Sequence, residues 1–169
     1  MIDLLAGITV LDLSSVGPAA RAAGWLADYG ADVVKVWAPK GSNAQITPPA
    51  HAYSGGRGTR RIRLDLKSPD GREEFLRLAE SADVVIESFR PGVVARLGIG
   101  YDDVKGRNPA IVYCQCSGFG SSGPYSAVPS YGGMMEALAG AHNMTMGDDG
   151  LMHRATRTGF GGTESGVWR

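Results

Sequence analysis

Near its start the chain places a strand, a helix and a second strand within about 30 residues, the length of one strand–helix–strand unit. Residues 8–14 (ITVLDLS) form a short apolar run with β-branched residues, and residues 31–39 (ADVVKVWAP) have the same character. Pro18 and Gly30 suit the beginning and the end of the helix between them. Strands joined by such a helix pair in parallel through a right-handed crossover. This unit therefore predicts a parallel sheet with helices on both faces.

The first two helices are each predicted to bury one apolar face. In the first helix, the apolar positions that share a face are Ala22, Trp25, Leu26 and Tyr29. The second helix has Ser68 as its N-cap and Pro69 as its first residue, and acidic residues follow in its first turn. Its buried face is predicted to consist of Phe75, Leu76, Leu78 and Ala79.

The alternation of strands and helices continues along the chain. Residues 61–67 alternate between apolar and polar, residues 83–88 are almost continuously apolar, and residues 110–120 begin as a buried strand and run into a loop. Two short helices are predicted within residues 91–109, and another helix is predicted for the segment MMEALAGAHNM. We therefore predict an α/β fold with a doubly wound, mostly parallel sheet and binding loops at the carboxyl ends of its strands.

Composition narrows the class of protein. A length of 169 residues suits about one domain, and 43% hydrophobic residues exclude a wholly disordered chain. Seventeen basic residues balance seventeen acidic ones, so no overall charge favours nucleic acid or a membrane surface. The apolar runs are too short to span a membrane, and the N-terminus lacks the basic segment of a secretory signal. Cys114 and Cys116 are too close in sequence to join distant segments, so we expect a reducing cytoplasm and no structural disulfide.

Glycine and proline gather where the predicted strands end, in the segments LSSVGP, WAPKGSN, ESFRPG and CSGFGSSGP. Ligands of open parallel sheets collect at these ends, and glycine lets the backbone approach them closely. Loops of α/β proteins are often glycine-rich for structural reasons, so the pattern alone leaves both interpretations open. No G-x-G-x-x-G follows the first predicted strand and no G-x-x-x-x-G-K-[ST] occurs, which disfavours the nucleotide-binding loops with those signatures.

Few side chains have the spacing of a known catalytic or metal site. The three histidines lack a spaced partner, so we expect no metal. Cys116 is a candidate nucleophile, although a cysteine in a strand is more often a small buried hydrophobe. The basic stretch from Arg57 to Arg63 suits either phosphate binding or a solvated strand edge. Glu164 lies between a glycine run and the start of a helix, where it is either a nucleophilic carboxylate or a partner of the helix dipole.

Four segments together resemble the class III CoA-transferases, a superfamily that includes formyl-CoA transferase, carnitine CoA-transferase and α-methylacyl-CoA racemase. They are LAGITVLDLSSVGP, LADYGADVVKV, RRIRLDLKSPDGRE and ADVVIESFRPGVVARLGIGYDDVKGRNPAIVYCQCSGFGSSGP. The resemblance implies that residues 1–169 are the N-terminal part of a Rossmann-like large domain, whose smaller companion domain lies outside this chain. It also implies an interlocked homodimer or a complex with a complementary subunit.

The resemblance further implies an activity. In the transferases, a carboxylate attacks the thioester of an acyl-CoA and forms a mixed anhydride, and CoA is passed to an acceptor carboxylic acid without any metal. A covalent intermediate of this kind divides one difficult acyl transfer into easier steps. The positions that match CoA contacts of the family are Val16, Gly17, Leu64, Lys67, Ser88, Phe89 and Arg96. Basic side chains among them suit the CoA phosphates, and the apolar ones suit adenine or pantetheine.

Three positions depart from the family pattern. Glu164 occupies the position of the catalytic aspartate, five residues after Gly159, and its extra methylene displaces the carboxylate. Ala38 follows Trp37 where relatives carry a phosphate-binding arginine, although Lys40 is a candidate replacement. Tyr131 stands where the racemase branch has a histidine. We therefore expect a CoA-transferase with Glu164 as acyl carrier. The alternatives are a non-catalytic or split CoA-binding subunit or fragment, and an acyl-CoA racemase or isomerase.

Overall fold

The computed structural model describes residues 3–14, 17–39, 56–139 and 144–154. These residues contain a five-stranded sheet with the order β3-β2-β1-β4-β5, in which every neighbouring pair is parallel. The strands are β1 (Thr9–Asp12), β2 (Asp32–Trp37), β3 (Arg60–Arg63), β4 (Val84–Glu87) and β5 (Val112–Gln115). The order reverses beside β1, as in doubly wound folds. The predicted α/β architecture is confirmed.

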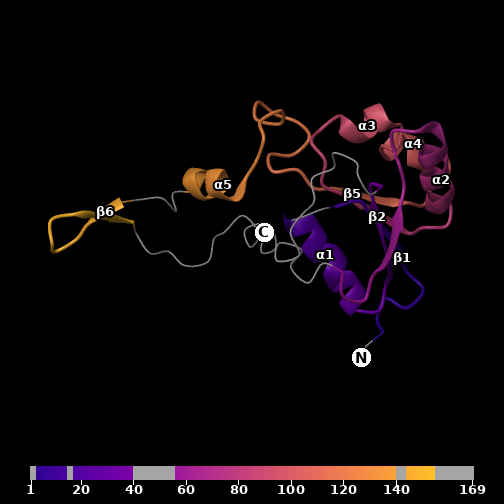
Figure 1. The fold of residues 1–169 in the computed structure, drawn as a ribbon, viewed down its shortest axis with the longest axis horizontal. Coiled ribbons are helices and arrows are strands. Elements are labelled where there is room, and N and C mark those ends of the chain that lie inside the picture. The colour runs from indigo at the N-terminus through magenta and orange to yellow at the C-terminus, as the bar shows by residue number, and fades with distance from the viewer. Residues whose placement is uncertain (1–2, 15–16, 40–55, 140–143, 155–169) are drawn as a thin grey trace.

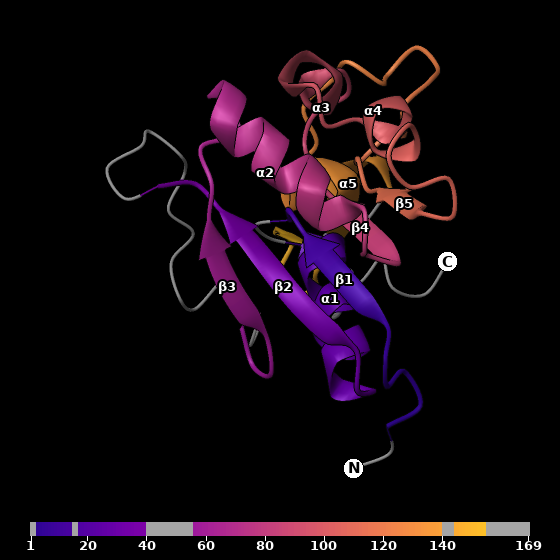
Figure 2. The same ribbon diagram turned by 90° about the vertical axis from the view of Figure 1, so that its right-hand side faces the viewer.

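Helices cover both faces of this sheet (Figure 2). Helix α1 (Gly17–Asp28) lies on one face, and helices α2 (Pro69–Ala79), α3 (Val93–Leu97) and α4 (Tyr101–Lys105) lie on the other. Helix α5 (Gly132–Leu138) and the antiparallel hairpin of β6 (Met144–Met146) and β7 (Met152–Arg154) lie outside these layers (Figure 1). No helix in the described part of the chain has the length and apolar character needed to cross a bilayer.

The core consists of one buried cluster on each face of the sheet. Successive residues of a strand point to opposite faces, so Leu11 packs under α2 while its neighbour Val10 packs under α1. Phe75 and Ile99 are completely buried in the larger cluster, which therefore ties α2 and the segment after α3 to the sheet. The predicted buried face of α2 is confirmed, because Phe75, Leu76 and Ala79 are buried and Leu78 is partly buried against the same cluster.

The buried face of α1 agrees with the prediction only in part, because Leu26 packs against the core cluster on that face as expected, but other predicted residues do not. Trp25 and Tyr29, expected in the core, are 44% and 53% exposed. The residues that α1 buries are instead small: Ala19, Ala20 and Ala23. Small side chains let the helix backbone lie close to the sheet. The prediction selected the helix face by its larger apolar residues and therefore did not identify this close contact.

Two strands also differ from the prediction. The paired part of β3 ends at Arg63, although Leu64 and Leu66 beyond it still pack against the larger cluster. The strand predicted from residue 110 is expected to begin buried. Ile111 is indeed buried in the larger cluster, but Val112, the first paired residue of β5, is 60% exposed. Among the described residues, β5 is the last strand of the sheet and pairs only with β4, so most of its residues face solvent. Tyr113 is the β5 residue that packs against the larger cluster.

Candidate functional site

A cavity of about 300 Å³ lies where the connection between β3 and α2 meets helix α3. It is lined by Leu66, Lys67, Ser68, Pro69, Arg72, Arg96 and Leu97. The segment that carries Lys67 leaves the carboxyl end of β3, and α3 follows the carboxyl end of β4. The cavity therefore lies beside the carboxyl ends of the strands, where ligands of open α/β folds bind.

A tight turn before α2 presents Lys67 to this cavity. Ser68 caps the helix, because its hydroxyl accepts a hydrogen bond of 3.0 Å from the backbone N–H of Gly71 and donates one of 2.8 Å to the carbonyl of Asp65. The backbone N–H of Lys67 donates to the Asp65 carboxylate at 3.1 Å. Gly71 has no room for a side chain, because a Cβ would collide with the Asp65 carbonyl. The predicted Ser68 cap is confirmed.

Arg96 reaches the cavity from a helix bounded by two glycines. Gly92 and Gly98, which flank α3, have φ angles of 82° and 68°. This left-handed backbone is easy for glycine and rare for other residues, so the pair confines α3 to five residues. A Cβ on Gly92 would lie 3.6 Å from Nη1 of Arg96, which places the guanidinium beside this glycine.

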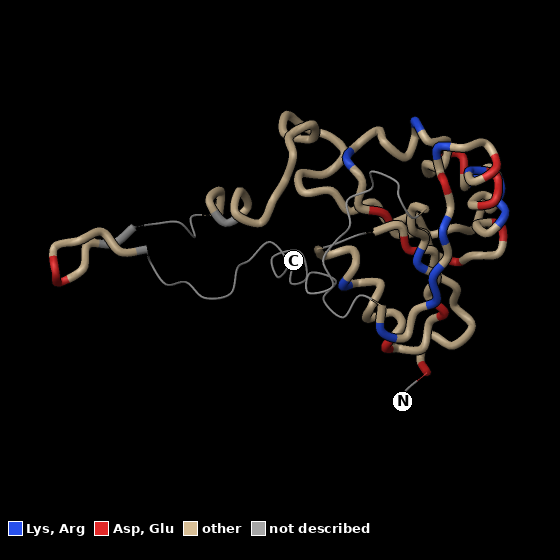
Figure 3. The backbone as a smooth tube through the Cα atoms, viewed as in Figure 1, with Lys and Arg blue, Asp and Glu red and all other residues tan. Residues whose placement is uncertain are grey.

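The cavity concentrates positive charge. Within the described residues, Lys67, Arg72 and Arg96 have no carboxylate at ion-pair distance, whereas Arg77 and Arg107 nearby are paired with glutamates. Elsewhere, basic and acidic residues alternate over α2 and its neighbours, and the hairpin tip is acidic (Figure 3). Three cations beside the apolar Leu66 and Leu97 suit a phosphate group attached to an organic molecule.

The structure brings together two of the predicted site residues, Lys67 and Arg96. Gly17, with a φ of 75°, begins α1 after β1, and Ser88 and Phe89 follow β4. These three residues lie near the carboxyl ends of the strands, as the cavity does, but they do not line the cavity. Leu64 packs against the larger core cluster rather than lining the cavity. Val16, Glu164 and Lys40 lie outside the described residues.

The carboxyl group of Glu87 orients the start of the loop that holds Ser88 and Phe89. One carboxyl oxygen, Oε2, accepts a hydrogen bond of 2.6 Å from the backbone N–H of Phe89, and the side chain is completely buried. Burial raises the pKa of Glu87, although the bonds from Phe89 and Gln115 oppose this shift. The other oxygen, Oε1, has no hydrogen-bond partner among the described residues.

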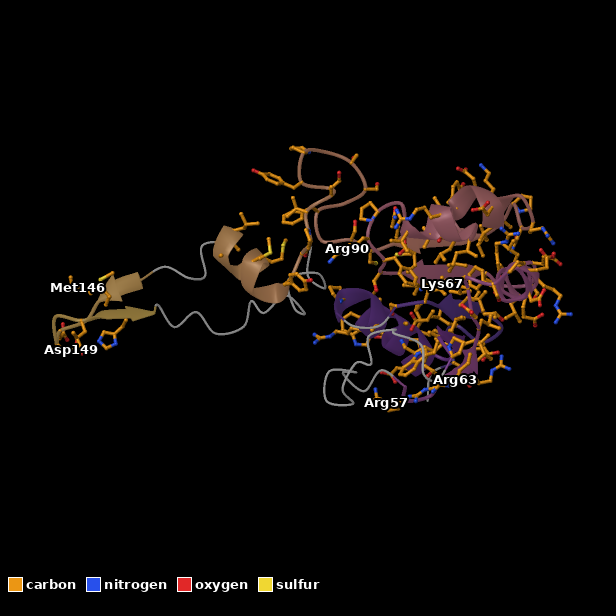
Figure 4. All side chains as sticks on the ribbon, turned by 45° about the horizontal axis from the view of Figure 1, so that its top comes forward. Arg57, Arg63, Lys67, Arg90, Met146 and Asp149 are labelled. Atoms are coloured by element: carbon orange, nitrogen blue, oxygen red, sulfur yellow. The ribbon has the colours of Figure 1, made fainter. Side chains whose placement is uncertain are left out.

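The basic stretch from Arg57 to Arg63 does not join the cavity. Arg57 pairs with Asp28, Arg60 pairs with Asp32, Arg61 lies 5.5 Å from the centre of the Trp37 ring, and Arg63 donates to the Ala38 carbonyl. Figure 4 labels Arg57 and Arg63, together with Lys67 of the cavity. Other groups of the protein therefore engage these arginines. This favours the interpretation of the stretch as a strand edge over its interpretation as a phosphate-binding site.

Sequence reasoning missed Arg72, although a signal was present. Residues four apart on a helix are neighbours, and Arg72 is four residues after the Ser68 cap. An arginine at that distance from a predicted N-cap lies beside the turn that carries Lys67. The same rule therefore predicts that Arg72 shares a surface with Lys67.

The other candidate residues do not form a second site in the described part of the chain. Burial raises the pKa of the Cys116 thiol to about 12, so this thiol stays protonated and is a poor nucleophile. His153 lies 2.8 Å from the carboxylate of Asp149 in the hairpin, and the other two histidines, at positions 51 and 142, lie outside the described residues. No cluster of three potential metal ligands occurs in residues 3–14, 17–39, 56–139 and 144–154.

The sequence and the fold both match one family. The model of the family described as "CoA-transferase family III" matches residues 5–163. The chain belongs to this family. A crystal structure of a CAIB/BAIF family protein from Brucella suis has a TM-score of 0.81 and 30% sequence identity, and the match covers 95% of this chain and 45% of that one. The fold and the family resemblance expected from the sequence are thus confirmed.

Two curated relatives give the scale of the similarity. A probable fatty acyl-CoA transferase of Mycobacterium tuberculosis, Rv3272, is 39% identical over 80% of this chain and 37% of its own length. A succinate–glutarate CoA-transferase of Agrobacterium fabrum is 36% identical over 89% of this chain and 41% of its own length. This family III chain therefore spans about two fifths of the length of the curated relatives it matches.

Proposed function

We propose that the protein is an acyl-CoA:carboxylate CoA-transferase and that the cavity beside α2 binds phosphate of CoA. The observation that carries the proposal is the meeting of Lys67 and Arg96 in one cavity of a family III chain. These residues are 29 positions apart in sequence (96 minus 67) and lie on different elements. Both keep their charge unpaired within the described residues, and an unpaired cation in a cavity is available to an anionic ligand.

The chemistry of the transfer follows from a carboxylate nucleophile. The Glu164 carboxylate attacks the thioester carbonyl, the C–S bond breaks, and CoA leaves as the thiolate while an acyl–glutamyl anhydride remains. The thiolate then attacks the glutamyl carbonyl, which releases the donor acid and leaves a glutamyl–CoA thioester. The acceptor carboxylate repeats these two steps in reverse order, so the acceptor leaves as its CoA thioester and Glu164 is regenerated.

A trapping experiment tests this chemistry in the protein as its native gene encodes it. Hydroxylamine added during incubation with an acyl-CoA converts an activated glutamyl group to a hydroxamate, which peptide mass spectrometry locates. We expect the modification on Glu164, and we expect Glu164→Gln to lower the transfer rate at least a thousandfold, the usual scale for a lost nucleophile. Full turnover by the Gln variant would overturn the assignment of Glu164.

A second candidate function is a CoA-binding subunit without catalysis. The observation that favours it is the glutamate at position 164 where the family carries aspartate, because one methylene can displace a nucleophile by about 1 Å and cost a hundredfold in rate. The two candidates differ in one comparison. If the glutamate is what prevents catalysis in a CoA-binding subunit, Glu164→Asp raises turnover. If the enzyme uses the glutamate, Glu164→Asp lowers turnover or leaves it unchanged.

Assembly and location complete the proposal. A second copy or a complementary subunit covers exposed apolar side chains of α5 and the hairpin, among them Leu138 and Met146, each 68% exposed. The native mass from light scattering tests this assembly. The protein works in the reducing cytoplasm, which agrees with two free thiols whose sulfur atoms lie 3.6 Å apart.

A further inference from the structure

Arg72 projects from α2 toward the end of α3. A Cβ on Gly98 would lie 2.9 Å from Cδ and 3.3 Å from Nη1 of Arg72, so the arginine side chain occupies the space that this glycine leaves open. Gly98 follows Leu97 at the end of α3, and both Leu97 and Arg96 line the cavity. The Arg72 side chain therefore bridges from one wall of the cavity to the other.

Its position on α2 leaves Arg72 without a helical salt bridge. The residues three and four positions away along the helix are Ser68, Pro69, Phe75 and Leu76, and none carries a carboxylate. Two arginines near Arg72 are paired, since Arg77 contacts Glu74, and Arg107 contacts Glu73 and Glu80. Arg72 is thus the arginine of α2 whose charge no described carboxylate neutralises.

We infer that Arg72 is a third phosphate-binding residue of the cavity, acting with Lys67 and Arg96. This inference rests on the proposed function and adds a residue to its binding site. A guanidinium can donate two parallel hydrogen bonds to phosphate oxygens, and a third cation favours a dianionic phosphate over a single negative charge. Glu73, Glu74 and Asp70 are the carboxylates nearest to Arg72 in sequence, and none of them lines the cavity.

The test is calorimetric titration of CoA and of dephospho-CoA into the protein as its native gene encodes it. We expect Arg72→Gln to weaken CoA binding about tenfold, the scale of one charge-assisted hydrogen bond, and Arg72→Lys to restore part of the loss. Arg77→Gln is the matched control, because Arg77 is on the same helix but faces Glu74 instead of the cavity. Circular dichroism verifies that all variants fold.

The two ligands identify which phosphate Arg72 holds. If Arg72→Gln weakens the binding of CoA but not of dephospho-CoA, Arg72 contacts the 3′-phosphate. If it weakens the binding of both ligands equally, Arg72 contacts the pyrophosphate. Either result supports the inference. Equal CoA affinity of Arg72→Gln and the wild type overturns it while leaving the proposed function intact. A wild-type protein that binds no CoA overturns the proposed function itself.

Discussion

Lys35 Nζ lies 2.5 Å from Asp12 Oδ2 in the interior, where the exposed fractions of the two side chains are only 3% and 1%. The two residues are direct partners in the register of β1 and β2. Asp12 also accepts a hydrogen bond of 2.8 Å from the backbone N–H of Ser14 and one of 2.5 Å from its hydroxyl. This ion pair fixes the alignment of the first two strands at the sheet edge that holds the site.

Removing one partner of this pair is expected to destabilise the fold. Lys35→Met leaves the buried Asp12 without its counter-ion, which costs about 3–5 kcal/mol of unfolding free energy in comparable cases. Urea denaturation followed by circular dichroism measures this loss. Arg77→Met is the control, because the Arg77–Glu74 pair is exposed to solvent and screened. A similar stability for both variants would contradict the structural importance of the buried pair.

Gly71→Ala is expected to disturb the turn that presents Lys67. The new methyl group would collide with the Asp65 carbonyl and the Ser68 hydroxyl, and such overpacking costs about 1–3 kcal/mol. The same measurement on Gly24→Ala provides the control, since a Cβ on this α1 residue meets no atom within 4 Å. Alanine in a helix is favoured over glycine, so we expect Gly24→Ala to stabilise the protein. Equal effects of the two substitutions would refute the close approach at Gly71.

The buried carboxyl of Glu87 predicts a pH dependence of stability. Because burial raises its pKa, the folded chain holds the Glu87 proton more tightly than the unfolded chain does. The stabilisation is therefore full below the ordinary value of 4.5 and is lost as the pH rises through the higher pKa of the folded state. Glu87→Gln, which has no proton to lose, should gain stability relative to the wild type over this rise. Denaturation curves at several pH values measure the difference, and parallel profiles would disprove it.

Neutralising the predicted cations of the cavity is expected to weaken CoA binding. Lys67→Gln and Arg96→Gln should each raise the dissociation constant about tenfold, and wild-type affinity should fall as salt screens the charges. Titration calorimetry at two salt concentrations checks both effects. Arg107→Gln serves as the control, because Arg107 binds Glu73 and Glu80 away from the cavity. Unchanged CoA affinity in both variants would show that the cavity is not part of the CoA-binding site.

The two thiols are expected to differ in reactivity. Cys116 has a pKa raised to about 12, chiefly by burial, so almost none of it is thiolate at pH 8. Cys114 is exposed at the sheet edge. We expect iodoacetamide to modify Cys114 more than tenfold faster in the native protein, with peptide mass spectrometry locating the label. Unfolding in urea should abolish the difference in rate. A faster reaction at Cys116 than at Cys114 in the native protein would contradict the shielding of the Cys116 thiol.

The order of the elements could be predicted from the sequence, but the buried face of α1 could not. Local signals such as the Ser68 cap and the glycines that flank α3 act within a few residues, so their effect can be seen in sequence. The packing of α1 depends instead on how closely the helix approaches the sheet, which the distant strands decide. That approach selected Ala19 and Ala23 for the interior and left Trp25 exposed.

By itself the sequence determined the family, the parallel sheet and the two cations Lys67 and Arg96. The sheet follows from hydrophobic periodicity, whose physical origin is the geometry of single helices and strands. The choice of Lys67 and Arg96 as candidate CoA contacts follows from the resemblance to the family. Only the tertiary structure decided that Lys67 and Arg96 meet in one cavity and that Arg72 joins them. It also decided that the stretch from Arg57 to Arg63 is held by the protein's own groups. Charges distant in sequence become neighbours only through the packing of helices against the sheet, which no local pattern specifies.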